Sequence, residues 1–317
     1  MLGILPREKL ARREAMWFWF FIAPWVIGFI LFRGFPILVS AVLSFTQYNV
    51  ARPPEWVGLQ NYTDLFHDAV FYKSLKVSGL YTLFSVPLGL IFSLTLALLL
   101  NQKVPFMGFF RTAYYMPALI GGSVAVAYLF ALIFNPVFGI VNFVIARIVG
   151  VHGLLPLGIK GPGWFFDPNW ALPGFILISL WGVGGPMLIY LAGLQGVPTT
   201  LYEAALIDGA GAWQRFRNVT LPMISPVILF NFITGIIGSF QIFTTAYIIS
   251  NGDGSPAYAS MFYVLYLYLN AFRRYRFGYA SAQAWLLFMV ILVLTILALR
   301  ASRQAVYYET PGDEKAG

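Results

Sequence analysis

This chain of 317 residues contains no cysteine, and only 10% of its residues carry a charge. The absence of cysteine excludes disulfides, thiolate catalysis and cysteine-ligated metals. A soluble domain carries about 25% charged residues, so this chain has too little charge to cover a water-facing surface of its size. Because 59% of the residues are hydrophobic, the sequence predicts an all-α membrane protein with lipid around most of the chain.

The chain also lacks the motifs of common enzyme classes. It has no G-x-x-x-x-G-K-[ST] loop, no nucleophile elbow and no H-E-x-x-H sequence. The net charge of +8 comes from Lys and Arg spread over connecting segments, which indicates membrane topology and lipid contact rather than nucleic-acid binding. We therefore expect a protein that is not an enzyme and that binds no metal, cofactor or nucleic acid itself.

Six apolar stretches are long enough to cross a hydrocarbon core about 30 Å thick as helices. They cover roughly residues 17–45, 77–100, 110–134, 171–195, 222–250 and 279–299. Two shorter apolar stretches, 138–151 and 261–272, are interrupted or closed by arginine, so we interpret them as interfacial helices. The sequence thus predicts one transmembrane domain over residues 17–303, between an N-terminal segment 1–16 and a polar tail 304–317.

The distribution of Lys and Arg predicts the orientation. These residues are denser in the segments that lie inside if the N-terminus is cytoplasmic. We therefore expect both termini in the cytoplasm. Arg273, Arg274 and Arg276 depart from this pattern, because they would lie outside.

The predicted spans contain no Asp, Glu or His, and Arg33 is their only charged residue away from a span end, since Arg111 lies at the start of the third span. Proton-coupled carriers need titratable groups within the membrane, so a proton symporter is disfavoured. Two interpretations of Arg33 are open: a functional site paired with a neighbouring helix, or a side chain that extends to the outer interface near the bend at Pro36. The second is favoured.

Residues 201–222, between the fourth and fifth spans, predict a helix, a sharp turn and a second helix. Residues 203–207 favour a helix, and Glu203 lies near its start, where the helix dipole favours an anion. Gly209 and Gly211 give the backbone the freedom to turn. Pro222 then opens the next span at a position that tolerates proline.

This segment resembles the EAA motif of binding-protein-dependent ABC importer permeases, E-A-A-x3-G-x9-I-x-L-P. The fixed positions are filled by Glu203, Ala204, Ala205, Gly209, Leu221 and Pro222, with Val219 in place of isoleucine. The resemblance implies that this loop faces the cytoplasm and docks on an ATPase subunit. We expect the coupling residues to be Glu203, Ala204, Ala205, Asp208, Gly209, Ala210 and Pro222.

Further segments are similar to carbohydrate-uptake permeases related to the maltose permease subunits, namely residues 85–88, 109–112, 191–198 and 277–282. The resemblance implies a multi-pass permease subunit in the cytoplasmic membrane of a prokaryote, which imports an oligosaccharide, a disaccharide or a glycerol-phosphate-like compound. It also implies a second permease subunit, two ATP-binding subunits that hold ATP and Mg, and an extracytoplasmic solute-binding protein. A stand-alone secondary carrier for a polar solute is the alternative.

The fifth span carries one face of small and hydrogen-bonding residues. At 100° per residue, an arc of about 120° contains most of them, and the candidate pathway residues are Asn231, Thr234, Gly238, Ser239, Gln241 and Thr245. Trp181, Tyr190 and Tyr247 are candidates to cover the apolar faces of a sugar ring. A sugar that crosses the membrane loses water from its hydroxyls, so polar side chains must replace those hydrogen bonds. Helix packing is the alternative explanation of this face, and the resemblance favours the pathway.

Overall fold

The computed structural model describes residues 7–102, 104–148 and 162–302. The predicted tail 304–317 and the end of the predicted interfacial helix 138–151 lie outside these residues. The chain divides into two compact units, Met1–Leu65 with Asn270–Trp285 and Phe66–Leu269 with Leu286–Gly317.

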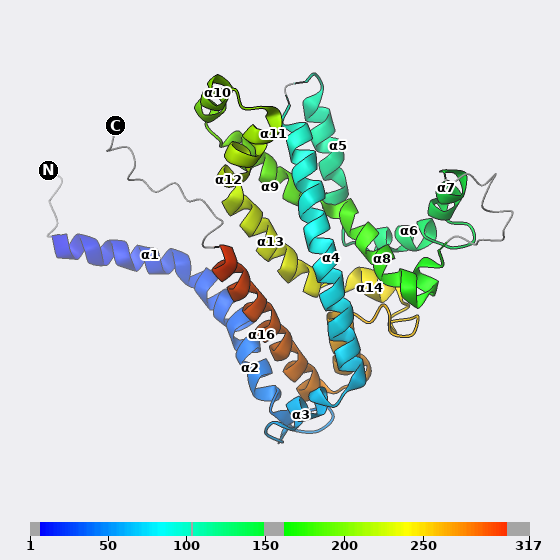
Figure 1. Ribbon diagram of the computed structural model, residues 1–317. Helices are drawn as coiled ribbons and strands as arrows, with labels where there is room; N and C mark the ends of the chain where they lie inside the picture. The colour runs from blue at the N-terminus through cyan, green and yellow to red at the C-terminus, as the bar shows by residue number, and fades with distance from the viewer. Residues whose placement is uncertain (1–6, 103, 149–161, 303–317) are drawn as a thin grey trace. The chain divides into compact units, whose positions relative to one another are not determined.

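The first unit begins with one long apolar helical segment (Figure 1). It consists of α1 (Arg7–Phe29), a π-helical turn (Ile30–Gly34) and α2 (Phe35–Leu43). Phe21 and Phe32 are among its many exposed aromatic side chains, which fits a helix in contact with lipid. Arg33 lies in the π-helical turn and is exposed. Strand β1 (Thr46–Gln47) pairs antiparallel with β2 (Glu55–Trp56), and α3 (Gln60–Phe66) follows.

The second unit is helical. It contains α4 (Ala69–Leu100), α5 (Met107–Ile120), α6 (Val124–Ile133), α7 (Ile140–Ile148), the 3-10 turns Trp164–Phe166 and Leu180–Gly182, α8 (Pro168–Ser179) and α9 (Gly184–Gln195). These are followed by α10 (Thr199–Ile207), α11 (Ala212–Arg215), a π-helical turn (Phe216–Thr220), α12 (Leu221–Met223), α13 (Ser225–Phe240), α14 (Thr244–Ile249) and α15 (Tyr263–Tyr268). The π-helical turn Leu269–Arg273 leads to α16 (Phe277–Ser302), which runs through the boundary between the units.

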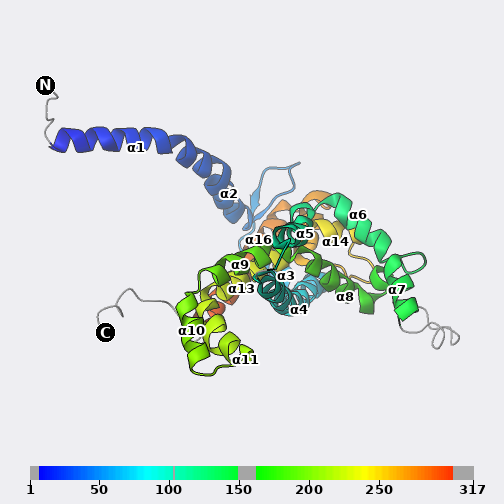
Figure 2. The ribbon, with the colours of Figure 1, turned by 90° about the horizontal axis from the view of Figure 1, so that it is seen from above.

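Helix α4 packs along α9 and α13 (Figures 1 and 2). The buried core at one end of this arrangement includes Leu100 from α4, Met187 and Leu194 from α9, and Ile224 just before α13. This packing fixes the start of α13 beside the segment that joins α9 to it. That segment is the predicted coupling loop.

Side-chain caps fix the start of three helices in the second unit. The carboxylate of Asp68 accepts hydrogen bonds from the backbone amides of Val70 and Phe71 at the start of α4. The hydroxyl of Ser123 accepts from the amide of Val126 in α6, and Asp167 caps α8, which begins with Pro168. Caps of this kind satisfy backbone amides that have no partner within the helix.

Four helical segments among the described residues are long and apolar enough to cross a membrane. They are Ala11–Leu43, Ala69–Leu100, Ser225–Ile249 and Phe277–Ser302. The predicted third and fourth spans are broken: α5 and α6 meet at 103°, and α8 with its 3-10 turn meets α9 at 46°. The number of candidate spans is therefore four, or up to six if each bent pair counts as one. Helix α7, and α15 with the π turn after it, are not among them.

Candidate functional site

The segment between α9 and α13 forms the helix, turn and second helix that its sequence predicts. Helix α10 ends at Ile207, and Gly209 then adopts a left-handed φ of +76°. The amide of Gly209 donates to the carbonyl of Leu206, and the amide of Ala210 donates to that of Ala205. These two bonds form a Schellman motif, which satisfies carbonyls at the helix end and favours glycine at the left-handed position.

Two further side-chain hydrogen bonds hold the shape of this loop. The amide of Gly211 donates to Oε1 of Gln214 at 2.7 Å, which caps α11. The hydroxyls of Tyr202 and Thr220 lie 3.0 Å apart and tie α10 to the turn that precedes α12. The loop is therefore an ordered structure rather than a flexible connection.

The surface of the loop combines acidic and apolar groups. Glu203, Ala204, Asp208 and Gly209 are exposed, whereas Ala205, Ala210 and Pro222 are half-buried. Ile207 is 88% exposed and Trp213 is 69% exposed, although both are large and hydrophobic. Exposed apolar side chains on one ordered element, beside a carboxylate, are typical of a surface that binds another protein.

Two neighbouring cavities lie between the helices of the second unit. The first has a volume of about 410 Å³ and lies between α4, the break before α9, and α13. The second, of about 300 Å³, lies beside the bend between α5 and α6 and the end of α8. Tyr81, Ser179, Gly182 and Ile242 line both cavities. These four residues therefore form the partition between them.

The cavities bring together some of the predicted pathway residues. Asn231, Gly238 and Ser239 line the first cavity, and Trp181 and Thr245 line the second. The amide of Asn231 is buried and donates to the carbonyl of Val227 at 3.1 Å. The side chain of Trp181 packs edge-on against Phe130.

The other four predicted pathway residues, Thr234, Gln241, Tyr190 and Tyr247, line neither cavity. The hydroxyl of Thr234 bonds to carbonyls of its own helix. Gln241 follows the last residue of α13, so the assumption of one regular helix from 231 to 245 is wrong and the predicted arc ends there. Tyr190 is fully buried in the core, and Tyr247 packs against Phe243 and Tyr268.

Helix α4 contributes to these cavities, which was not predicted from the sequence. Tyr81, Ser85, Val86 and Gly89 all face the first cavity, and the hydroxyl of Tyr81 interacts with those of Ser85 and Ser179. A signal was present, because positions 78, 81, 82 and 85 place serine, tyrosine and threonine on one helical face.

No group of three or more His, Asp and Glu residues that would hold a metal ion occurs within the described ranges. The observed polar groups in the cavities are hydroxyls, an amide, the indole N–H of Trp181 and backbone atoms. Groups of this kind bind and orient a neutral polar solute through hydrogen bonds.

Known proteins resemble this chain over most of its length. Residues 85–307 match the sequence model of the family described as "Binding-protein-dependent transport system inner membrane component". The probable ABC transporter permease protein YesP of Bacillus subtilis (strain 168) is 38% identical over 307 residues, 96% of both chains. The lactose transport system permease protein LacF of Rhizobium radiobacter is 35% identical, over 94% of this chain and 98% of LacF.

The fold is similar to solved importer structures. A chain of a bacterial alginate ABC transporter, crystallised with an alginate pentasaccharide-bound periplasmic protein, superposes with a TM-score of 0.78 at 21% identity. The alignment covers 95% of this chain and 99% of that chain. At this identity the likeness concerns the fold. Together with the match to the family over most of the chain, it leads to one conclusion: this protein belongs to the inner-membrane components of binding-protein-dependent transport systems.

Proposed function

We propose that this chain is the permease subunit of an ATP-driven importer for a sugar, and that it couples ATP hydrolysis on a partner subunit to solute movement. The observation that carries the proposal is the ordered loop around Gly209, which presents Glu203 and Ile207 on an exposed surface. A family member without a nucleotide site of its own needs a contact surface of this kind, through which the ATPase can drive its conformational change.

The substrate class is supported by relatives and by the cavities. LacF is named for lactose, and the 34% identical AraP of Bacillus subtilis (strain 168) is named for arabinooligosaccharides. The first cavity offers the side chains of Tyr81, Ser85 and Asn231. These groups replace water around the hydroxyls of a sugar, because each can donate or accept a hydrogen bond.

The proposed topology has six spans with both termini in the cytoplasm, each bent helix pair counting as one crossing. This count places the loop around Gly209 on the cytoplasmic side, where the ATPase lies. It places the segment 44–68 and the start of α16 on the opposite side. The importer then consists of this chain, a second permease subunit, two ATP-binding subunits and an external solute-binding protein, in the cytoplasmic membrane of a prokaryote.

The test is reconstitution of the complete importer in liposomes. We expect sugar uptake that needs ATP inside the liposomes, the ATP-binding subunits, both permeases and the loaded binding protein. Omission of any one component should abolish uptake, and the purified chain alone should show no ATPase activity above background. Uptake by this chain alone, driven by an ion gradient, would support the stand-alone carrier instead and contradict the proposal.

A further inference from the structure

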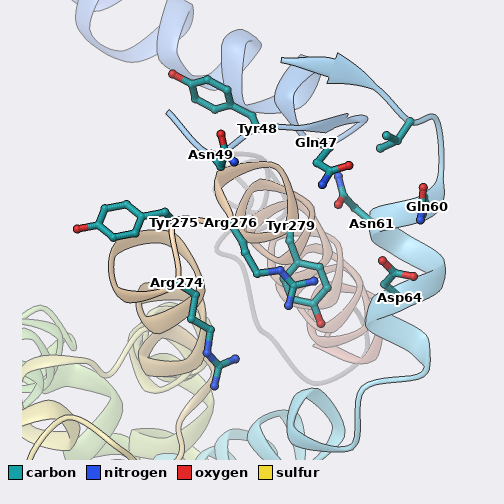
Figure 3. Close-up of a pocket in the computed structure, with 11 residues that line it drawn as sticks. Gln47, Tyr48, Asn49, Gln60, Asn61, Asp64, Arg274, Tyr275, Arg276 and Tyr279 are labelled. Atoms are coloured by element: carbon teal, nitrogen blue, oxygen red, sulfur yellow. The ribbon is translucent and has the colours of Figure 1, made fainter. Parts of the chain in front are cut away.

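The first unit contains a small polar pocket that the proposed function does not use (Figure 3). Its volume is about 230 Å³, and its walls come from residues 47–64 and 274–279. The polar residues Gln47, Gln60, Asn61, Asp64 and Arg276 line it. Both segments lie outside the apolar parts of the candidate spans or at their ends, so the proposed topology puts the pocket at the outer membrane surface.

The walls of the pocket are held in fixed positions. The side-chain amide of Asn61 is buried and donates 2.9 Å hydrogen bonds to the carbonyls of Ser44 and Thr46. The backbone amide of Phe277 donates to the carbonyl of Tyr48 at 2.9 Å. A Cβ at Gly278 would overlap the carbonyl oxygen of Thr46, so only glycine permits this close approach of the loop to α16.

Backbone strain occurs next to the same pocket. Tyr275, which lines the pocket, has φ of +54°, and Val50, directly after the lining residue Asn49, has φ of +64°. A β-branched or aromatic residue in the left-handed region is an outlier. Such conformations persist where the surrounding structure enforces them, and they cluster at binding sites.

Two charged groups of opposite sign lie on facing walls. Figure 3 shows Arg276 beside Tyr279 on one wall and Asp64 on the other. The guanidinium of Arg276 lies 4.3 Å from the centre of the Tyr279 ring, a cation–π contact that orients it. Within the described part of the chain, no ion pair or side-chain hydrogen bond engages Arg276 or Asp64.

An open pocket with an unused cation and an unused carboxylate favours a ligand that both donates and accepts hydrogen bonds. An ammonium ligand would be repelled by Arg274 and Arg276, and a phosphate or carboxylate ligand would offer no hydrogen-bond donor to Asp64. A neutral polyol satisfies both, since each hydroxyl donates to a carboxylate and accepts from a guanidinium. We propose that this pocket is a binding site for one sugar ring on the face opposite the coupling loop, an assignment that rests on the proposed sugar-importing function.

This site also accounts for an anomaly of the sequence. The basic residues 273, 274 and 276 lie on the side that the proposed topology places outside, against the usual distribution. Arg274 donates to the side chain of Asn270 at 2.9 Å and lines the pocket together with Arg276. Two of the three arginines thus belong to the pocket, whereas Arg273 does not line it.

The experiment measures direct binding of free sugars to the complete importer in lipid nanodiscs, without the binding protein. The probes are glucose, galactose, arabinose and lactose, and titration calorimetry or saturation-transfer NMR gives the Kd. We expect Asp64→Asn and Arg276→Gln each to raise the Kd about tenfold, because each removes a charged hydrogen-bond partner. Arg273→Gln is the matched control and should leave the Kd unchanged.

The outcomes separate this site from the transport function. No binding of any probe, in a wild-type importer that transports sugar with its binding protein, overturns the pocket assignment and leaves the function intact. Binding that is lost in Asn231→Leu but kept in Asp64→Asn and Arg276→Gln overturns it as well, since the sugar then lies in the second unit. If Asp64→Asn and Arg276→Gln weaken only the affinity of the importer for its loaded binding protein, the pocket binds a side chain of that protein. This result also overturns the sugar site. Failure of uptake with all partners present counts against the proposed function, whatever the pocket binds.

Discussion

The hydroxyl of Ser239 in α13 donates a 2.8 Å hydrogen bond to the hydroxyl of Thr82 in α4. Both side chains are buried, and the bond joins two residues that are 157 positions apart in the sequence. Ser239 was predicted as a pathway residue, and it lines the first cavity. Because its hydroxyl is engaged with α4, we now assign it to helix packing.

Replacement of Ser239 by alanine should therefore lower stability more than it alters transport. Interhelical hydrogen bonds in membranes are worth about 0.6 kcal/mol on average, so we expect a small decrease in the thermal midpoint of the purified complex. The sugar concentration for half-maximal uptake should stay the same. Thr234→Ala is the control, because the hydroxyl of Thr234 donates to the carbonyls of Phe230 and Asn231 within α13. A changed substrate preference in Ser239→Ala would return this residue to the pathway.

Gly184 and Gly185 offer a paired test of helix packing. A Cβ at Gly184 would overlap the carbonyl oxygen of Tyr114 in α5, whereas a Cβ at Gly185 meets no atom within 4 Å. We expect Gly184→Ala to destabilise the protein by about 1–3 kcal/mol through overpacking. Gly185→Ala should be neutral or slightly stabilising, because alanine favours helix. Thermal unfolding in detergent provides the measurement, and equal effects of the two variants would refute the packing account.

Gly209 should be required for coupling because of its left-handed backbone. Gly209→Ala forces a Cβ into this conformation at a cost of about 1–2 kcal/mol, and Gly209→Pro cannot adopt it because proline fixes φ near −65°. We expect the alanine variant to transport slowly and the proline variant not at all, with both inserted in the membrane. Gly211→Ala is the matched control, since Gly211 has φ of −69° and a Cβ there would make only an ordinary 3.7 Å contact with Oε1 of Gln214. Uptake and stimulated ATPase activity are measured in proteoliposomes.

Glu203 should make a charge-assisted contact with a basic residue of the ATPase. Its side chain is exposed on α10, so substitution should not disturb the fold of this chain. We expect Glu203→Lys to abolish uptake and weaken assembly with the ATPase. Glu203→Gln should retain part of the uptake and part of the assembly. Copurification of the ATP-binding subunits reports assembly. Wild-type uptake by Glu203→Lys would remove this residue from the coupling surface.

Asn231 and Gln241 should differ in their effect on transport, although the sequence placed them on one face. Asn231 lines the first cavity and Gln241 lines neither. Asn231→Leu should therefore leave an intact complex with impaired or substrate-altered uptake, and Gln241→Leu should have little effect. The measurement compares uptake of several labelled sugars with the amount of assembled complex. Loss of assembly in Asn231→Leu would instead assign that amide to packing.

Local sequence signals predicted the helix, turn and second helix of residues 201–222 well. Gly209 marks the left-handed turn and Pro222 marks the start of the following helix, and both effects act over a few residues. The bend of the third span was not predicted, because the residues on both sides of Gly121 and Gly122 are equally apolar. Composition gives the length of a span, whereas the angle between its halves depends on tertiary packing.

The cavities were only partly predictable for a related reason. A helical arc on the fifth span includes Asn231 and Gly238, which line the first cavity, yet it assumes a regular helix beyond Phe240, where α13 ends. Tyr81 and Ser85 come from a helix more than a hundred positions away in the sequence, and only the packing of α4 against α13 brings them to the same cavity. Periodicity identifies a face of one helix and does not identify the helix that it meets.

The bend between α5 and α6 has a consequence for solvation. Gly121 and Gly122 interrupt the helix and line the second cavity, and Gly122 has φ of +76°. Backbone groups outside a helix are tolerated at membrane depth only where they are buried in protein or face water. We therefore expect water in the second cavity, where it would bond to the backbone groups that the bend at Gly121 and Gly122 leaves outside a helix.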